Sequence, residues 1–267
     1  MDFLSKYSIG IKIGKGFSGT VFECFCRNTG KKYACKIVSG LKETERNENE
    51  INILKNLSHN NINNIKEVFY NRDSNNPTNY IITDFAEKDL FDYTKQYRTN
   101  ENSAKHFTKQ ILLVVNYLHN NNICHCDIKH ENFLCFNVSD KDNFDDLTLK
   151  LIDFEFSKYT HNNNGKRKRL LGRSGTISFM APEMLKKKTY TELIDLWSVG
   201  VITYSMLYHT YPIVYQRIEV PDNFNVSYTK NSNISDCAID FVKKLLVEDP
   251  KNRMSSHEAL NHEWLQI

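Results

Sequence analysis

Gly14, Gly16 and Gly19 are the first residues along the chain whose type and spacing indicate chemistry. Glycine has no Cβ atom, so the backbone amides of such a run can approach phosphate oxygens closely. In a dinucleotide-binding fold a comparable run follows a strand and opens a helix, whereas here a second strand is expected to follow. The run therefore favours a hairpin that covers phosphates, although a flexible hairpin turn without a ligand would have the same composition.

Charged and amide side chains further along could hold the rest of a phosphate-bearing ligand. Lys36 lies on the next expected strand, and Glu50 lies on the one helix expected in this region, where its carboxylate could orient the ammonium group. Asp127, Lys129 and Asn132 stand together in a short polar segment. Further on come Asp153-Phe154-Glu155 and then Ala181-Pro182-Glu183.

The elements that position these residues follow from hydrophobic periodicity. Alternating apolar and polar residues over 7–37 predict three antiparallel strands, and a helical period over 43–57 predicts one helix. One more strand is predicted over 80–85. The remainder predicts helices over roughly 102–121, 192–208 and 235–247, with short strands near 133–136 and 149–152. We therefore predict an α+β chain with a small antiparallel-sheet lobe containing one main helix at 1–86 and a larger, mostly helical lobe at 87–267.

Composition limits the class of protein. The chain has 267 residues, of which 40% are hydrophobic and 25% charged, the proportions of a water-soluble globular protein. A formal net charge of +3 is too small to indicate a surface built for nucleic acid or an anionic membrane. No stretch approaches the ~20 apolar residues of a membrane span, and the N-terminus lacks the pattern of a secretory signal. We expect a cytoplasmic or nuclear protein.

The seven cysteines form no disulfide-like array, so we expect reduced thiols. Cys124, His125 and Cys126 could suggest zinc, but no second ligand pair stands at the spacing of a structural site.

Taken in order, the glycine run, the strand lysine, the polar segment 125–132, Asp153 and Ala181-Pro182-Glu183 resemble the eukaryotic protein kinases. The resemblance covers residues 7–264, and the ending of the chain is most similar to the calcium/calmodulin-dependent kinase group. It implies a bilobal kinase fold and an ATP-dependent serine/threonine protein kinase, a transferase that moves the γ-phosphate of ATP to Ser or Thr hydroxyls of proteins. A lysine two places after Asp127 is typical of the serine/threonine class.

The resemblance also implies a role for each candidate residue. Asp127 would orient the substrate hydroxyl and accept its proton, and Lys129 would support the γ-phosphate. Mg²⁺ ions would be held by Asn132 and Asp153, since hard oxygen ligands suit magnesium. The remaining residues would bind ATP: Gly14, Gly16 and Gly19 over the phosphates, Lys36 on the α- and β-phosphates with Glu50 behind it, Val21, Ala34 and Leu134 around the adenine, Thr83 at the back of its pocket, and the main chain of Asp84 and Ala86 at its edge.

Two departures from the family pattern bear on regulation and activity. Cys126 replaces the usual arginine that clamps a phosphorylated residue, and Gly172 stands where that phosphothreonine normally lies. Their joint absence is physically coherent, and it predicts activity that does not depend on phosphorylation at the usual site. Glu155 stands where the family has glycine. A residue with a side chain pays ~1 to 2 kcal/mol to adopt backbone conformations that glycine adopts freely. Glu155 also adds a carboxylate beside the expected metal site.

Alternative functions remain open at this point. A pseudokinase that binds nucleotide and acts as a scaffold or allosteric partner would accommodate Glu155, whereas a kinase-like small-molecule phosphotransferase is disfavoured by Gly175-Thr176 and Ala181-Pro182-Glu183. The expected partners are protein substrates, with no nucleic-acid substrate and no membrane, and the expected state is a monomer. The basic run 166–169 fits a solvated loop, a nuclear-import patch or a site for an acidic partner.

Overall fold

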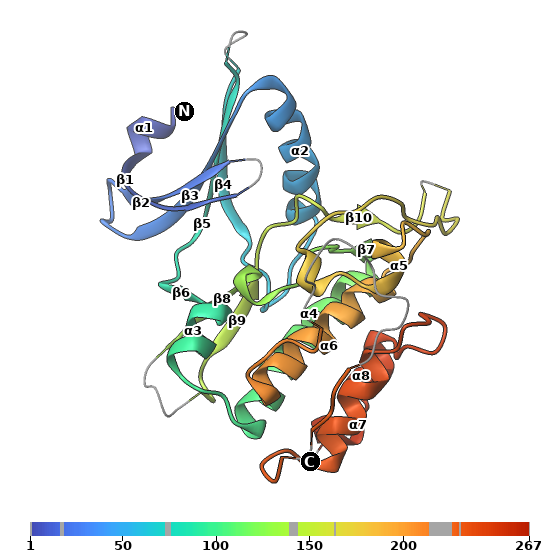
Figure 1. Cartoon of the computed structure of the whole chain (residues 1–267). Helices are drawn as coiled ribbons and strands as arrows, with labels where there is room; N and C mark the ends of the chain where they lie inside the picture. Colours follow the sequence, from blue (N-terminus) through green and yellow to red (C-terminus); the bar gives the residue numbers. More distant parts are fainter. Residues whose placement is uncertain are drawn as a thin grey trace. The chain divides into compact units, whose positions relative to one another are not determined.

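The computed structural model describes residues 2–16, 19–72, 76–138, 144–162, 164–213, 226–229 and 231–266 (Figure 1). The chain divides into two compact units. The first unit contains Met1–Glu87 together with Ile152–Glu155, and the second contains Lys88–Leu151 and Phe156–Ile267. The predicted domain boundary between residues 86 and 87 stays a prediction. Phe17 and Ser18, inside the glycine run, lie outside the described residues.

The first unit contains a five-stranded antiparallel sheet with the strand order β1-β2-β3-β5-β4. Its strands are β1 (Tyr7–Lys15), β2 (Thr20–Cys26), β3 (Lys32–Ser39), β4 (Ile65–Asn71) and β5 (Thr78–Asp84). The three strands predicted over 7–37 and the strand near 80–85 are confirmed. The strand β4 was not predicted; it lies at the sheet edge and only its Phe69 is buried, so its sequence lacks an apolar alternation.

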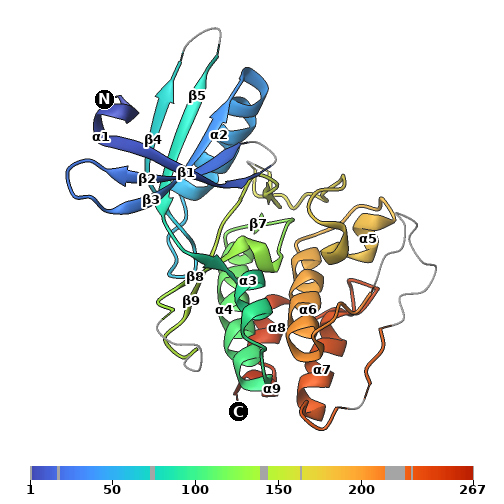
Figure 2. The ribbon, with the colours of Figure 1, turned by 60° about the vertical axis from the view of Figure 1, so that its left-hand side comes forward.

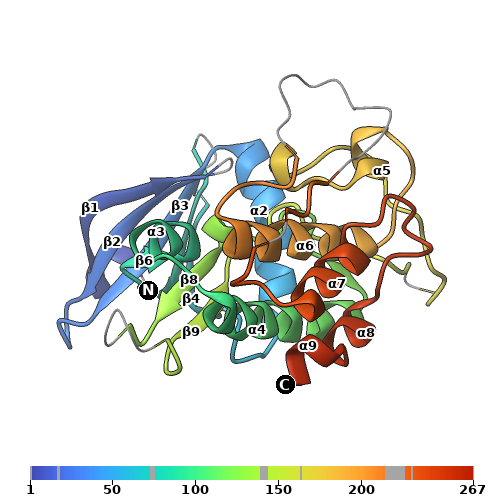
Figure 3. The same ribbon diagram turned by 60° about the horizontal axis from the view of Figure 1, so that its bottom comes forward.

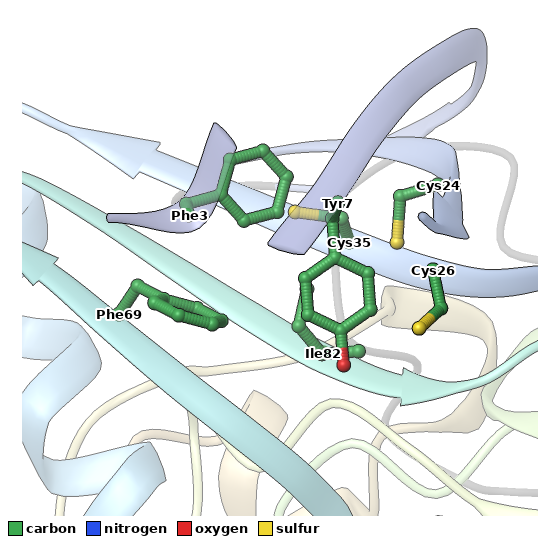
Figure 4. Packing of buried hydrophobic residues seen from close by; sticks show 7 residues of the cluster. All are labelled: Phe3, Tyr7, Cys24, Cys26, Cys35, Phe69 and Ile82. Carbon is green, nitrogen blue, oxygen red and sulfur yellow. The ribbon is translucent and has the colours of Figure 1, made fainter. Parts of the chain in front are cut away.

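Strand pairing assigns the two faces of this sheet. Val21 pairs with Lys36, and Ala34 pairs with Thr83. Because side chains alternate along a strand, these four residues share one face. The other face carries a core of buried side chains, to which the short helix α1 (Phe3–Lys6) adds Phe3 (Figure 4). This core consists of Phe3, Tyr7, Cys24, Cys26, Cys35, Phe69 and Ile82.

The helix α2 (Leu41–Lys55) packs on β3 and β4 (Figure 2). Ile51 and Leu54 are buried against the sheet. Asn47 lies four residues before Ile51, and Glu50 lies four residues before Leu54, so the same helix face buries these two polar side chains as well. A buried carboxylate is costly unless it is paired, and Glu50 therefore requires a cation nearby.

The second unit is mainly helical, and α4 (Glu101–Asn120) and α6 (Leu193–Tyr208) lie side by side in it (Figure 3). Both helices, and α7 (Asp236–Leu245), confirm the predicted helices. Asn100 and Ser103 form a capping box that begins α4. Short helices that were not predicted complete the unit: α3 (Leu90–Gln96), α5 (Pro182–Leu185), α8 (Ser256–Leu260) and α9 (Glu263–Gln266).

Short strands frame the polar segment 125–132 in the second unit. Before it, β7 (Ile123–Cys124) pairs with β10 (Lys158–Tyr159). After it, the 3-10 turn η1 (His130–Asn132) leads directly into β8 (Phe133–Phe136), which pairs with β9 (Thr148–Leu151) and β6 (Lys88–Asp89). The predicted strands near 133–136 and 149–152 are confirmed, and the segment is anchored at both ends.

All seven cysteines are free, as predicted, and six of them are buried. In the part of the chain that the structure describes, no helix has the length and apolar content needed to cross a membrane.

Candidate active site

In the first unit, Lys36 forms an ion pair with the buried carboxylate of Glu50. Lys36 Nζ lies 2.8 Å from Glu50 Oε2 and 3.1 Å from Oε1. Asn47 Nδ2 donates a hydrogen bond of 2.8 Å to Glu50 Oε2, and Asn79 Nδ2 in turn donates to Asn47 Oδ1. The carboxylate is therefore held in place from the helix and from the sheet. Asn47 was not singled out from the sequence, although its spacing of three residues from Glu50 was a usable signal.

Asp153 and Glu155 belong to the same unit and also approach Lys36. Asp153 Oδ1 lies 3.6 Å from Lys36 Nζ, and Glu155 Oε2 lies 3.7 Å from it. Burial alone would lower the pKa of Lys36, but the carboxylates of Glu50, Asp153 and Glu155 outweigh burial and raise its pKa. The lysine is thus a fixed positive charge at every physiological pH.

The expected strain at Glu155 is not found, because its backbone does not adopt a positive φ. Asp153 (φ 63°) and Cys126 (φ 67°) carry the left-handed backbone in these motifs instead. Aspartate tolerates this conformation better than most residues with a side chain. The concern that folding must absorb a cost at Glu155 is therefore wrong.

The glycines lie on the hairpin between β1 and β2. Gly14 pairs with Val21, and the Gly16 amide donates a hydrogen bond of 2.8 Å to the carbonyl of Gly19. A Cβ atom on Gly19 would stand 2.6 Å from the carbonyl oxygen of Ile37 on β3. Glycine is therefore required at position 19 by the close approach of a neighbouring strand, independently of any ligand.

The predicted adenine residues of the first unit whose side chains would contact the base share one face of the sheet. Val21 and Thr83 are half-buried and Ala34 is buried, all on the face that carries Lys36. The main-chain carbonyl of Asp84 accepts a hydrogen bond of 3.0 Å from Asn63 Nδ2, and a carbonyl can accept a second one. Ala86 follows at the end of the unit and is half-buried.

In the second unit, Asp127, Lys129 and Asn132 are brought into contact. Lys129 Nζ lies 2.9 Å from Asp127 Oδ2. Asn132 Nδ2 donates to the same oxygen at 3.1 Å and to the main-chain carbonyl of Asp127 at 2.8 Å. Leu134 follows on β8 and is half-buried. Asp127 is thus a buried carboxylate with a fixed orientation beside one ammonium group.

Thr176 completes this cluster, and its contacts were not foreseen. Its backbone amide donates a hydrogen bond of 3.0 Å to Asp127 Oδ1, and its hydroxyl accepts one of 3.0 Å from Lys129 Nζ. The preceding Gly175 has φ +90°, and a Cβ atom there would lie 2.7 Å from Asp127 Oδ1. The Gly175-Thr176 pair in the sequence was the signal, but only the folded chain shows that it contacts Asp127.

Asp195 supports the backbone of the same segment from α6. Its two carboxylate oxygens accept hydrogen bonds from the amides of His125 (2.9 Å) and Cys126 (3.0 Å). Cys126 occupies the position expected for an arginine, and its buried thiol lies 3.4 Å from the sulfur of Cys124. The Asp195 carboxylate therefore fixes the backbone at the start of the polar segment 125–132.

The structure offers oxygen atoms suited to a magnesium ion. Asp153 Oδ1 is buried and has no hydrogen-bond partner among the described residues. The Nδ2 group of Asn132 donates to Asp127, which leaves its amide oxygen as the atom with ligand chemistry. Across the described ranges, no group of three or more His, Cys, Asp or Glu side chains could hold a metal by itself. Asp153 in the first unit and Asn132 in the second thus each offer an oxygen donor of the kind that suits Mg²⁺, which proteins usually bind through one or two carboxylates together with phosphates and water.

Comparison with known proteins places the chain among its relatives. The sequence model described as "Protein kinase domain" matches residues 7–265. Myosin light chain kinase 3 of Rattus norvegicus is 35% identical over 263 residues, which cover 95% of this chain and 32% of that protein. Calcium-dependent protein kinase 4 of Plasmodium berghei is 33% identical over 273 residues, covering 97% and 49%. Calcium/calmodulin-dependent protein kinase type IV of Mus musculus is 32% identical over 272 residues, covering 97% and 54%.

The chain spans between about a third and about half of the length of these three relatives. The match nevertheless covers almost every residue of the chain, including both compact units. The chain therefore belongs to the protein kinase domain family and is related to its calcium/calmodulin-dependent group.

Proposed function

We propose that the chain is a serine/threonine protein kinase that transfers the γ-phosphate of ATP to Ser or Thr hydroxyls of protein substrates. The observation that carries the proposal is the environment of Asp127. Its carboxylate is buried and contacts Lys129, Asn132 and the amide of Thr176. A carboxylate oriented from three directions is suited to position a hydroxyl group and to receive its proton, since proton transfer requires geometry first.

Asp127 and Lys129 are the proposed catalytic residues. Asp127 orients the substrate hydroxyl and accepts its proton as the oxygen attacks phosphorus. Lys129 Nζ, 2.9 Å from this carboxylate, places a positive charge beside it and supports the γ-phosphate. Because the transferred group carries spread negative charge, such positioning and charge neutralisation account for most of the catalysis expected of the protein.

Lys36 is the proposed ligand of the α- and β-phosphates, with Glu50 holding its ammonium group 2.8 Å away. The amides around the glycines of the β1–β2 hairpin would cover the phosphates. The adenine would contact the remaining predicted residues: Val21, Ala34, Thr83 and Leu134 through side chains, and Asp84 and Ala86 through the main chain.

Asp153 and Asn132 are the proposed Mg²⁺ ligands, supported by the buried Asp153 Oδ1 and by the oxygen of the Asn132 amide. Bound Mg²⁺ supplies positive charge that neutralises the triphosphate. The Asn132 amide has a fixed direction, because its Nδ2 group donates hydrogen bonds to Asp127.

Activity is proposed to be independent of phosphorylation at the site usual for the family, where this chain has Gly172. Gly172 has φ +94° and no hydroxyl group to accept a phosphate, and Cys126 has no guanidinium group with which to bind one. Thr160 is buried, which limits the access of another kinase to its hydroxyl. Phosphatase-treated protein should retain its rate, and a large increase in rate after phosphorylation of Ser174 or Thr160 would contradict this part of the proposal.

Transfer of radiolabelled phosphate from ATP to a generic protein tests the main proposal. Asp127→Asn should lower kcat by at least ~100-fold. Asp240→Asn, which removes an exposed carboxylate of α7, serves as the matched control and should leave the rate unchanged. Equal melting temperatures would show that the difference is chemical. The proposal fails if wild type and Asp127→Asn transfer phosphate at the same rate.

The second candidate is a nucleotide-binding pseudokinase that acts as a scaffold or allosteric partner. The buried Glu155 favours it, since its carboxylate stands 3.7 Å from Lys36 where phosphate oxygens would be expected. Saturable ATP binding by calorimetry, combined with no phosphate transfer to any tested protein, would support this alternative. A monomeric state and a cytoplasmic or nuclear location stay predictions.

A further inference from the structure

One ammonium group in the first unit faces three carboxylates. Lys36 Nζ lies 2.8 Å from Glu50, 3.6 Å from Asp153 and 3.7 Å from Glu155. The side chains of Glu50 and Glu155 are each only 5% exposed, and that of Lys36 is 16% exposed. Negative charge therefore exceeds positive charge among these four groups, and water screens them poorly.

Glu50 alone is sufficient to hold Lys36. Both of its oxygens lie within hydrogen-bond distance of the ammonium, and Asn47 fixes the carboxylate from behind. Glu155 approaches the same ammonium from the segment that carries Asp153, and it forms a longer ion pair of 3.7 Å. The charge of Glu155 is therefore an addition to a pair that is already complete, and it also acts on any other charged group that approaches Lys36.

A triphosphate is the group most affected. A phosphate oxygen that approaches Lys36 would lie within a few ångströms of the Asp153 and Glu155 carboxylates. Like charges at such distances repel strongly in a poorly solvated site. A divalent cation bound at Asp153 Oδ1, a buried oxygen without a hydrogen-bond partner among the described residues, would reverse the sign of this interaction. The Glu155 carboxylate would then attract the metal–nucleotide complex.

We propose that Glu155 makes nucleotide binding depend on a divalent cation, so that this chain discriminates against metal-free ATP. The inference rests on the proposed ATP site and assigns Glu155 as a residue that determines specificity for the metal-bound form of the nucleotide. Glutamate at this position thereby excludes a bound state that cannot lead to phosphate transfer. Glycine, the residue that the family pattern led us to expect, has no charge with which to do so.

Calorimetric titration of ATP tests the proposal, with Mg²⁺ in one series and EDTA in the other at matched ionic strength. The measured quantity is the ratio of the two dissociation constants. Glu155→Gln and Glu155→Gly should lower this ratio about tenfold relative to wild type, because metal-free ATP then binds more tightly. The matched control is Glu23→Gln, which removes a carboxylate from a lysine pair of 2.9 Å in the same sheet and should leave the ratio at the wild-type value.

Adenosine provides the second measurement, since it carries no phosphate. Its affinity should be the same in Mg²⁺ and in EDTA, and the same in every variant, which would show that the base pocket is intact. If Glu155→Gly does not fold, the shape-preserving Glu155→Gln variant decides the test. An unchanged ratio in Glu155→Gln, or wild type that binds ATP equally well in EDTA, overturns the inference and leaves the proposed function standing. Failure of wild type to bind ATP under either condition overturns both.

Discussion

The guanidinium of Arg253 donates two hydrogen bonds to the carboxylate of Glu183, at 2.8 and 3.0 Å. The Arg253 side chain has no exposed surface, and the Glu183 side chain is 6% exposed. Arg253 also donates to the main-chain carbonyls of Leu193 and Val247. The pair thus joins α5 to the start of α6 and to the segment that follows α7. Its role is to stabilise the fold.

Removal of one partner of this pair should destabilise the fold. We expect Arg253→Met to lower the free energy of unfolding by about 3 to 5 kcal/mol, because the Glu183 carboxylate is left buried without its counter-charge. Urea denaturation followed by circular dichroism measures the change. Lys244→Ala is the control, since it breaks an exposed pair with Asp240 and should cost less than about 1 kcal/mol. Equal losses in both variants would contradict this assignment.

Two glycines with similar backbone angles should respond differently to a methyl group. Gly175 (φ +90°) faces Asp127, whereas a Cβ atom on Gly172 (φ +94°) meets nothing within 4 Å. Gly175→Ala should therefore displace Asp127 and lower kcat about 100-fold or more. Gly172→Ala should cost only the strain of the left-handed backbone, about 1 to 2 kcal/mol of stability, with kcat nearly unchanged. Steady-state rates and melting temperatures of both variants separate the two effects.

Asp195 should make stability depend on pH in acid. Burial alone would raise its pKa, but the bonds and charges of His119 and His125 outweigh burial and hold the pKa of Asp195 below the ordinary value. Because the folded-state pKa is the lower one, Asp195 stabilises the fold above the unfolded-state pKa of about 3.9, and this contribution is lost as the pH falls through the folded-state pKa.

Urea denaturation between pH 7 and pH 3 tests this dependence. Asp195→Asn should be less stable than wild type at pH 7, and the difference should shrink below about pH 4 as the wild-type carboxylate is protonated. Asp240→Asn, at an exposed position, should show a much smaller difference across the same range. A difference for Asp195→Asn that is constant with pH would exclude its carboxylate as the source.

Thr83 should control sensitivity to inhibitors that compete with ATP. It pairs with Ala34 across the sheet, on the face that carries Lys36. Thr83→Met adds side-chain volume beside Ala34, so inhibitors with a bulky group directed past Thr83 should lose potency about tenfold or more, while the KM for ATP changes little. Inhibitors without such a group provide the control, and unchanged potency of the bulky ones would contradict the prediction.

Much of the fold could be predicted from local patterns in the sequence. Apolar and polar residues alternate over several positions in the strands β1 to β3, whereas α4, α6 and α7 have long apolar faces. Each of these two patterns can be buried by only one type of secondary structure. The edge strand β4 could not be predicted, because only Phe69 of its residues is buried and a one-sided contact leaves little periodicity. The short helices are similarly too brief to establish a period.

The sequence by itself determined which residue types are present for phosphate chemistry, because charge and the absence of a side chain are properties of the residues. Only the tertiary structure decided their contacts. Asp153 and Glu155 join the unit that carries Lys36, although more than a hundred residues separate them from it, and Thr176 meets Asp127 through a backbone amide. Such contacts depend on the path of the backbone and on packing between remote segments. The residues next to Asp153 or Thr176 in the sequence do not reveal which remote segment each will meet.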